Sequence, residues 1–135
     1  MRVSDIMVKV ALKARPDEAL DEIRSRMEAD RIRHLPVVDA QEKVVGMLSD
    51  RDLLRARGFH RAPRRVSELM TTQVGTISPD APAADAAKKI VDFKIDALPV
   101  VDHDKIVGIV TSTDCVALAR RLLLNEGSTA PASTT

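Results

Sequence analysis

The sequence contains two copies of one unit, and this duplication is the strongest constraint on what it can fold into. The segment Val3–Met7 recurs as Val66–Met70, and Leu35–Asp39 recurs as Leu98–Asp102 with the same offset. Val45-Gly46 and Asp52 match Val107-Gly108 and Asp114 at an offset that is one residue shorter. The turn before these residues is therefore one residue shorter in the second copy. Two copies of one unit predict a pseudo-two-fold axis, and the seam between them is where a functional site is expected.

The duplication divides the 135 residues into two small domains. We expect a first repeat at residues 1–62, with a basic linker near 58–65, a second repeat at 63–124 and a disordered tail at 125–135. A unit of about 62 residues buries only about 60% of its unfolded surface and is marginally stable alone. The two repeats are therefore expected to share an interface. The tail is rich in Ser, Thr, Ala and Pro, which is typical of disorder.

The composition excludes several classes of function. The net charge is +1 with 30% charged residues, which argues against nucleic acid as the main partner. Only 1% of the residues are aromatic, so base stacking is unavailable. Cys115 is the only cysteine, which excludes an internal disulfide and a cysteine-based zinc site. No histidines have metal-ligand spacing, and no apolar run approaches membrane-spanning length. We therefore expect a cytoplasmic protein without a membrane segment or metal site.

Each copy is expected to fold in the order β-α-β-β-α, which predicts an α/β (α+β) fold. The central helices carry apolar stripes at spacings of three and four, with Leu20 and Ile23 in the first copy and Ala83 and Ala86 in the second. Near-continuous Val, Ile and Leu in the strands predict sheets covered on both faces, by helices and by the other copy's sheet. The expected segments are helical turns at 4–7 and 67–70, extended segments at 10–14 and 74–77, hairpin strands at 35–39, 44–48, 98–102 and 106–110, and final helices near 50–57 and 112–124.

A duplicated Gly-x-x-[Ser/Thr]-x-x-Asp segment is the main candidate for a binding site. It contains Gly46, Ser49 and Asp52 in the first copy, with its counterpart at 108–114, and each lies where a strand ends and a helix begins. Backbone N–H groups at a helix start attract phosphate, and an acidic residue can hold a ribose diol. Alternatively, the hydroxyls are helix N-caps and the aspartates complement the helix dipole. Recurrence in both copies favours the functional interpretation.

These motifs together resemble a tandem pair of CBS domains, the Bateman module. The resemblance rests on Val-Ser-Asp-Ile-Met, Arg-Ile-Arg-His-Leu-Pro-Val-Val-Asp, Val-Val-Gly-Met-Leu-Ser-Asp-Arg-Asp-Leu-Leu and their second-copy partners, and it covers residues 1–124. It implies a stand-alone regulatory module that binds AMP, ADP, ATP or S-adenosylmethionine in clefts between the copies and signals to an unknown effector protein. A subunit with degenerate, empty clefts is the alternative.

The resemblance also implies the residues of two clefts. One cleft would combine the first-copy motif with second-copy strand residues: Ser49, Arg51, Asp52, Thr76, Ala97, Leu98 and Pro99. The other would combine the second-copy motif with first-copy residues: Thr111, Thr113, Asp114, Lys13, His34, Leu35 and Pro36. Two departures from the family pattern stand out, because Lys13 replaces a common Thr and Asp96-Ala97 replaces the cationic pair Arg33-His34.

The cations among these residues favour a phosphorylated ligand. A bare nucleoside would leave Lys13, Arg33, His34 and Arg51 without an anionic partner, whereas phosphate accepts charge-assisted hydrogen bonds. We therefore expect AMP, ADP or ATP to bind better than adenosine or S-adenosylmethionine, with no metal beyond Mg²⁺ carried by the nucleotide. Residues 51–65 hold six of the fourteen arginines, which form either a solvated surface or a site for an anionic partner.

The chain lacks the signatures of common enzymes. No Walker A, Rossmann, nucleophile-elbow or H-E-x-x-H motif occurs, and Ser49 has no evident His-Asp pair, so we expect no catalysis. Apolar helix residues remain to be covered, and in the resembled family two such pairs commonly join through their helices. We therefore expect a homodimer that buries Leu53, Leu54, Val116 and Leu118.

Overall fold

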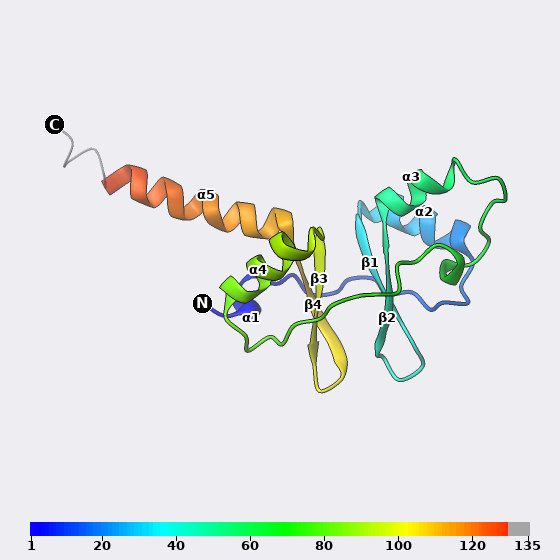
Figure 1. The fold of residues 1–135 in the computed structure, drawn as a ribbon, viewed down its shortest axis with the longest axis horizontal. Coiled ribbons are helices and arrows are strands. Elements are labelled where there is room, and N and C mark those ends of the chain that lie inside the picture. The colour runs from blue at the N-terminus through cyan, green and yellow to red at the C-terminus, as the bar shows by residue number, and fades with distance from the viewer. Residues whose placement is uncertain (130–135) are drawn as a thin grey trace.

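The computed structural model describes residues 1–129, with side chains described up to Glu126. Figure 1 shows two small α/β halves, each a β-hairpin with helices on its outer side. The first half contains α2 (Leu20–Asp30), β1 (His34–Val38), β2 (Val44–Ser49) and α3 (Asp50–Ala56). The second half contains α4 (Ala83–Phe93), β3 (Ala97–Asp102), β4 (Lys105–Thr111) and α5 (Ser112–Thr129). Two short helical turns complete the chain: α1 (Val3–Ile6) at its start and η1 (Val66–Glu68) after the linker. The predicted mixed α/β fold of two similar units is confirmed.

Each sheet is an antiparallel hairpin, and the two hairpins have matching registers. Pro36 faces Met47 in β1–β2, and Pro99 faces Ile109 in β3–β4. The register shifts after Val37 and at the equivalent Val100, so even the irregularity is duplicated. The extended segments predicted before the central helices form no strand of their own. Each makes a single parallel bridge, Ala14 with Val37 and Ile77 with Val100, because a proline follows two residues later and cannot donate to a ladder.

The two hairpins pack against each other through an aliphatic cluster. Val38, Ile106 and Ile109 are buried there, with Val10, Val44 and Ala97 packed around them. The helices α2 and α4 lie on the outer sides of the sheets (Figure 1). Both sheet faces are therefore covered, as the continuous Val and Ile runs predicted.

The first helical turn of each repeat packs into the other half of the molecule. Val3 of α1 is fully buried in the second core beside Ile77 and Val110, and its N–H donates to the carbonyl of Ala81 at 2.8 Å. Val66 of η1 is fully buried in the first core, with its N–H 3.1 Å from the carbonyl of Glu18. The physical halves therefore do not coincide with a sequence boundary between residues 62 and 63. The exchange ties the halves together, because neither core is complete without a segment of the other repeat.

The duplicated glycines allow these exchanged segments to cross the sheets. A Cβ at Gly108 would lie 2.7 Å from the Met7 sulfur, and a Cβ at Gly46 would lie 2.6 Å from the Met70 sulfur. Beside these glycines, Val8 bridges Ile109 and Thr71 bridges Met47. The glycine of the predicted binding motif therefore has a packing role, because a side chain would collide with the crossing segment.

The two final helices differ in length. α3 ends at Ala56, whereas α5 continues past Asn125 to Thr129, so residues 125–129 are helical where a disordered tail was predicted. The remaining predicted tail, 130–135, lies outside the described residues. Among the apolar residues expected at a dimer interface, Leu54 and Val116 are largely exposed, whereas Leu53 packs against the first core. No described helix is both long and apolar enough to cross a membrane.

Candidate functional site

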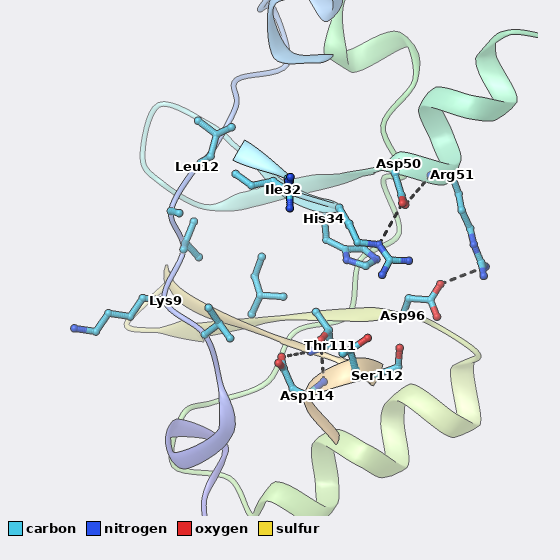
Figure 2. A pocket seen from close by; sticks show the side chains of 17 residues that line it. Lys9, Leu12, Ile32, His34, Asp50, Arg51, Asp96, Thr111, Ser112 and Asp114 are labelled. Atoms are coloured by element: carbon cyan, nitrogen blue, oxygen red, sulfur yellow. Dashed lines mark hydrogen bonds and ion pairs between the residues drawn. The ribbon is translucent and has the colours of Figure 1, made fainter. Parts of the chain in front are cut away.

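A cleft of about 530 Å³ lies between the two halves, beside the start of α5. Its volume falls in the range of about 300–1,000 Å³ that is typical of small-molecule sites. Figure 2 shows side chains from both repeats pointing into it. The walls combine the crossing segment 8–12, the turn before β1, the start of α3, Asp96 and the start of α5. The lining residues are Val8, Lys9, Val10, Ala11, Leu12, Arg31, Ile32, Arg33, His34, Asp50, Arg51, Asp96, Ile109, Thr111, Ser112, Thr113 and Asp114.

Thr111 and Asp114 form a reciprocal cap at the start of α5. The Thr111 N–H donates to Asp114 Oδ2 at 2.8 Å, and the Asp114 N–H donates to Thr111 Oγ1 at 3.1 Å. This capping box satisfies two backbone donors that the helix start would otherwise leave unpaired. Asp114 Oδ1 takes part in no hydrogen bond or ion pair within residues 1–129. One carboxylate oxygen therefore holds the helix start, and the other is available to a ligand.

Ser49 and Asp52 repeat the capping box but not the free oxygen. The Ser49 N–H donates to Asp52 Oδ2 at 2.9 Å, and the Asp52 N–H donates to Ser49 Oγ at 3.1 Å. Asp52 Oδ1 lies 3.5 Å from Arg55 Nη2, and the residue is only 8% exposed. Neither Ser49 nor Asp52 lines the cleft. The interpretation of the motif as a helix cap therefore holds in both copies, and the second copy alone combines it with an open carboxylate.

Two arginines at the cleft already have carboxylate partners. Arg33 Nε lies 3.3 Å from Asp50 Oδ2, and Arg51 Nη1 lies 3.2 Å from Asp96 Oδ2. The second pair joins the first repeat to the second across the cleft, as Figure 2 shows. The premise that a bare nucleoside would leave Arg33 and Arg51 unpaired is therefore wrong. Sequence reasoning also placed Arg51 with Ser49 and Asp52, whereas its side chain reaches the cleft at Thr111.

His34 lies half-buried in the cleft wall at the start of β1. Burial lowers the pKa of its imidazole below the ordinary value of 6.5, and the nearby Arg33 and Arg51 lower it further. The carboxylates of Asp50 and Asp96 raise the pKa, each by more than either arginine lowers it, but burial is the largest influence and the pKa stays lowered. The ring is therefore mostly neutral at neutral pH, so it offers a hydrogen bond rather than a charge.

Several predicted site residues lie elsewhere. Lys13 Nζ is 2.5 Å from Glu42 Oε2 at the β1–β2 turn, so Lys13 does not line the cleft, and the segment 8–12 before it does. Thr76 is exposed, and its carbonyl accepts from Lys89 Nζ at 3.0 Å. The strand residues of both predicted clefts lie in the sheets and do not line this cleft: Leu35, Pro36, Ala97, Leu98 and Pro99. All of them are buried except Ala97, which is half-buried.

Sequence reasoning missed the acidic half of the cleft. Asp50 directly follows Ser49 in the motif, and Asp96 was noted only as a departure from the family pattern. The Arg51–Asp96 ion pair joins residues of different repeats, so no local sequence signal could have identified it. Within residues 1–129 no group of three or more His, Cys, Asp or Glu side chains could hold a metal ion.

A duplicated fold with a ligand-sized cleft at its seam defines a class, the tandem domain pair with a candidate binding cleft between its repeats. A CBS domain model matches residues 3–58 and again residues 66–121, so the chain belongs to the CBS domain family and is a CBS domain pair. The resemblance identified from the sequence is confirmed. CBS domain pairs are in general regulatory modules rather than catalytic ones.

Two curated relatives illustrate how the pair occurs. The chain is 33% identical to the CBS domain-containing protein YhcV of Bacillus subtilis, over 93% of this chain and 89% of that protein. It is 35% identical to a homoserine O-acetyltransferase of Methanohalobium evestigatum over 83% of this chain. The chain spans only 23% of the length of that enzyme, whose name describes the whole relative.

Two solved structures superpose closely on this fold. The CBS domain pair of protein MJ0100, in complex with 5-methylthioadenosine and S-adenosyl-L-methionine, has a TM-score of 0.80 and 33% identity over 87% of this chain and 94% of that one. CBSX2 in complex with AMP has a TM-score of 0.77 and 26% identity over 90% of this chain and 97% of that one. Similar CBS pairs therefore bind ligands that contain adenosine.

Proposed function

We propose that this chain is a sensor of adenine nucleotides, which binds AMP, ADP or ATP in the cleft at Thr111 and Asp114 and transmits the bound state to a partner protein. The observation that carries the proposal is the free Oδ1 of Asp114 at the wall of a ligand-sized cleft. A carboxylate oxygen there can accept hydrogen bonds from a ribose diol. The AMP complex of CBSX2, a protein with the same fold, supports this choice of ligand.

The cleft offers complementary surfaces for the other parts of a nucleotide. Val10, Ile32 and Ile109 supply apolar area on which an adenine ring can be desolvated. Lys9 and Arg31 line the cleft, and neither has an ion-pair partner in the described part of the chain. These two cations, with Arg33 and Arg51 once a phosphate displaces their aspartates, favour an anionic ligand.

S-adenosylmethionine is the second candidate, and the acidic residues of the cleft favour it. Asp50 and Asp96 lie at the cleft, where they could attract a sulfonium or ammonium group. The structure of MJ0100 with S-adenosyl-L-methionine and 5-methylthioadenosine also supports this candidate. The two ligands make opposite demands on the same ion pairs, since phosphate needs the arginines and a cationic ligand needs the aspartates.

Two measurements test the proposal. Native mass spectrometry of the freshly purified protein should show added mass from retained nucleotide. Isothermal titration calorimetry with AMP, ATP, adenosine and S-adenosylmethionine at low and high salt should rank the phosphorylated ligands first, with a preference that weakens as salt screens exposed charges. If adenosine or S-adenosylmethionine binds as tightly as ATP, or if Arg33→Ala with Arg51→Ala leaves ATP affinity intact, the phosphate preference is refuted. If none of the ligands binds, the chain is a structural subunit with an empty cleft.

Transmission to a partner requires a surface that ligand binding can change. We propose a homodimer joined through the outer helices, because Leu54 on α3 and Val116 on α5 are 63% and 66% exposed. Light scattering at tens of micromolar, with and without ATP, tests the homodimer. A monomer under both conditions would contradict it.

A further inference from the structure

A second concave surface lies on the first half, away from the cleft. This groove has a volume of about 1080 Å³ and is formed by the start of α2, the end of α3, the linker and η1. In Figure 1 the linker loops outward beyond α3, on the side opposite the second repeat. The charged residues that line the groove are Asp21, Arg24, Arg57, Arg61, Arg64 and Glu68.

Three arginines of the groove are without side-chain partners. Three of the six arginines in residues 51–65 have a partner within the chain. Arg51 pairs with Asp96, Arg55 pairs with Asp52 and lies over the Phe59 ring, and Arg65 donates to the carbonyl of Asp17. The other three are Arg57, Arg61 and Arg64, which all line the groove. Their side chains make no hydrogen bond or ion pair within residues 1–129.

The two acidic residues of the groove do not neutralise these arginines. Asp21 lies 3.2 Å from Arg24, so that pair is balanced. The Glu68 carboxylate accepts the backbone N–H groups of Arg65 and Arg64 at 2.7 Å and 2.6 Å. These bonds, Arg65 first, lower the pKa of Glu68 and keep it ionised at the end of the linker. The groove therefore carries more positive than negative charge.

The second repeat shows that the fold does not require this basic surface. By the offsets of the repeat, Ala119 and Met1 stand at the positions of Arg57 and Arg64, whereas the linker that carries Arg61 has no counterpart because α5 continues there as a helix. The corresponding hollow is lined by Met1, Asp5 and Leu118 and by one arginine, Arg121, and it measures only about 190 Å³. Because the second repeat folds without arginines at the positions of Arg57 and Arg64, the fold of the repeat does not need these two side chains.

We propose that this groove docks an acidic peptide segment of a partner protein, with the peptide's carboxylates paired to Arg57, Arg61 and Arg64. Arginine pairs bidentately with carboxylates, and three unpaired arginines in one groove are complementary to several of them. Phe59, which is 42% exposed, and the adjacent Ala62 and Pro63 add an apolar wall for a hydrophobic side chain of the peptide. The inference goes beyond nucleotide sensing and does not depend on it.

The groove suits a peptide better than a nucleic acid or a free polyphosphate. Asp21 and Glu68 would repel a continuous phosphate backbone, whereas a peptide can place uncharged residues opposite them. The whole chain carries a net charge of only +1, which is far from the strongly basic footprint of a nucleic-acid binder.

Fluorescence anisotropy tests the proposal with a short fluorescein-labelled peptide of Glu-Glu-Leu repeats and the full chain without nucleotide. We expect saturable binding that weakens with salt. The triple variant Arg57→Ala, Arg61→Ala, Arg64→Ala should lose at least about tenfold in affinity. A matched triple variant, Arg26→Ala, Arg120→Ala, Arg121→Ala, removes the same charge from other exposed positions and should bind as the wild type does. Circular dichroism verifies that both variants remain folded.

Three results would overturn the proposal. The first is no binding of the peptide up to about 1 mM at low salt. The second is an equal loss in both triple variants, which would show attraction by net charge alone. The third is tighter binding of tripolyphosphate or duplex DNA than of the peptide, lost in the Arg57, Arg61 and Arg64 variant, which would assign the groove to a phosphate polyanion.

The variant Phe59→Ala tests the apolar wall of the groove. It should bind the Glu-Glu-Leu peptide more weakly than the wild type does, but its affinity for a peptide of glutamate alone should be unchanged.

Discussion

At Ser49 and at Thr111 the chain makes the same strand-to-helix turn, with the same pair of reciprocal hydrogen bonds between a hydroxyl residue and an aspartate. The two aspartates nevertheless differ in what surrounds their second oxygen. Asp52 is buried against Arg55, whereas Asp114 lines the cleft with that oxygen unpaired. A duplicated motif can therefore cap two helices and still leave only one aspartate open to a ligand.

The largest expected effect is a difference in AMP affinity between variants of these two aspartates. Asp114→Ala should weaken AMP binding by about ten- to a hundredfold, because a charged hydrogen-bond acceptor contributes about 1.5–3 kcal/mol. Asp52→Ala should leave AMP affinity unchanged and lower the free energy of unfolding by about 0.5–2 kcal/mol through the lost cap. Isothermal titration calorimetry and urea unfolding of both variants measure these quantities. Equal losses of affinity would show that both copies bind.

The glycines of the motif provide the second test. Gly46→Ala and Gly108→Ala should each destabilise the fold by about 1–3 kcal/mol, because the new Cβ meets a methionine sulfur and a backbone carbonyl of the crossing segment. Only Gly108→Ala should also weaken AMP, since the segment displaced there includes Val8 of the cleft wall.

Gly58→Ala is the matched control for these variants. The atom nearest to its new Cβ would be the Arg55 carbonyl oxygen, at 3.6 Å, which is an ordinary van der Waals contact. The free energy of unfolding should therefore change by less than about 0.5 kcal/mol. Thermal unfolding of the three variants provides the measurement. If all three behave alike, the duplicated glycines have no packing role.

The ion pair across the cleft gives a smaller effect. Asp96→Asn should release Arg51 and raise ATP affinity by about two- to fivefold at low salt, since exposed ion pairs contribute up to about 1 kcal/mol. Asp92→Asn breaks a similar exposed pair with Lys88 on α4, away from the cleft, and should leave ATP affinity unchanged. Calorimetric titration of ATP at two salt concentrations compares them. Tighter binding of S-adenosylmethionine in Asp96→Asn would run against the assigned role of this carboxylate.

The smallest effect concerns pH. Because burial holds the pKa of His34 below 6.5, the unfolded chain takes up a proton first as the pH falls. The free energy of unfolding should therefore lose a contribution as the pH drops through 6.5, and this loss ends once the pKa of the folded state is passed. His34→Gln should flatten that part of the profile in urea unfolding between about pH 7.5 and about pH 5.5. Identical profiles for the two proteins would mean that His34 does not titrate differently on folding.

The sequence predicted the repeated architecture because local signals repeat in register. The hairpins at β1–β2 and β3–β4 and the helix starts at Asp50 and Ser112 follow from β-branched runs and [Ser/Thr]-x-x-Asp segments, which act over a few residues. Thr111, Thr113, Asp114, Arg33, His34 and Arg51 were all predicted site residues, and the structure brings them to one cleft.

The features that sequence reasoning missed depend on how the two repeats are placed relative to each other. The burial of Val3 in the second core and of Val66 in the first is a long-range exchange that no local period encodes. The Arg51–Asp96 pair joins residues of different repeats, so neither helix periodicity nor strand alternation could predict it. Lys13 was misplaced because its side chain turns toward Glu42, a residue in a hairpin turn with positive φ.

The number of AMP molecules bound per chain tests the central claim most directly. If only the second repeat's aspartate is open to a ligand, calorimetric titration of the wild-type protein with AMP should saturate at one molecule per chain. That stoichiometry should persist in Asp52→Ala, whereas Asp114→Ala should show the weakened binding of the same single site. Saturation at two molecules per chain, with one lost in each variant, would contradict the account and restore the symmetric pair of clefts.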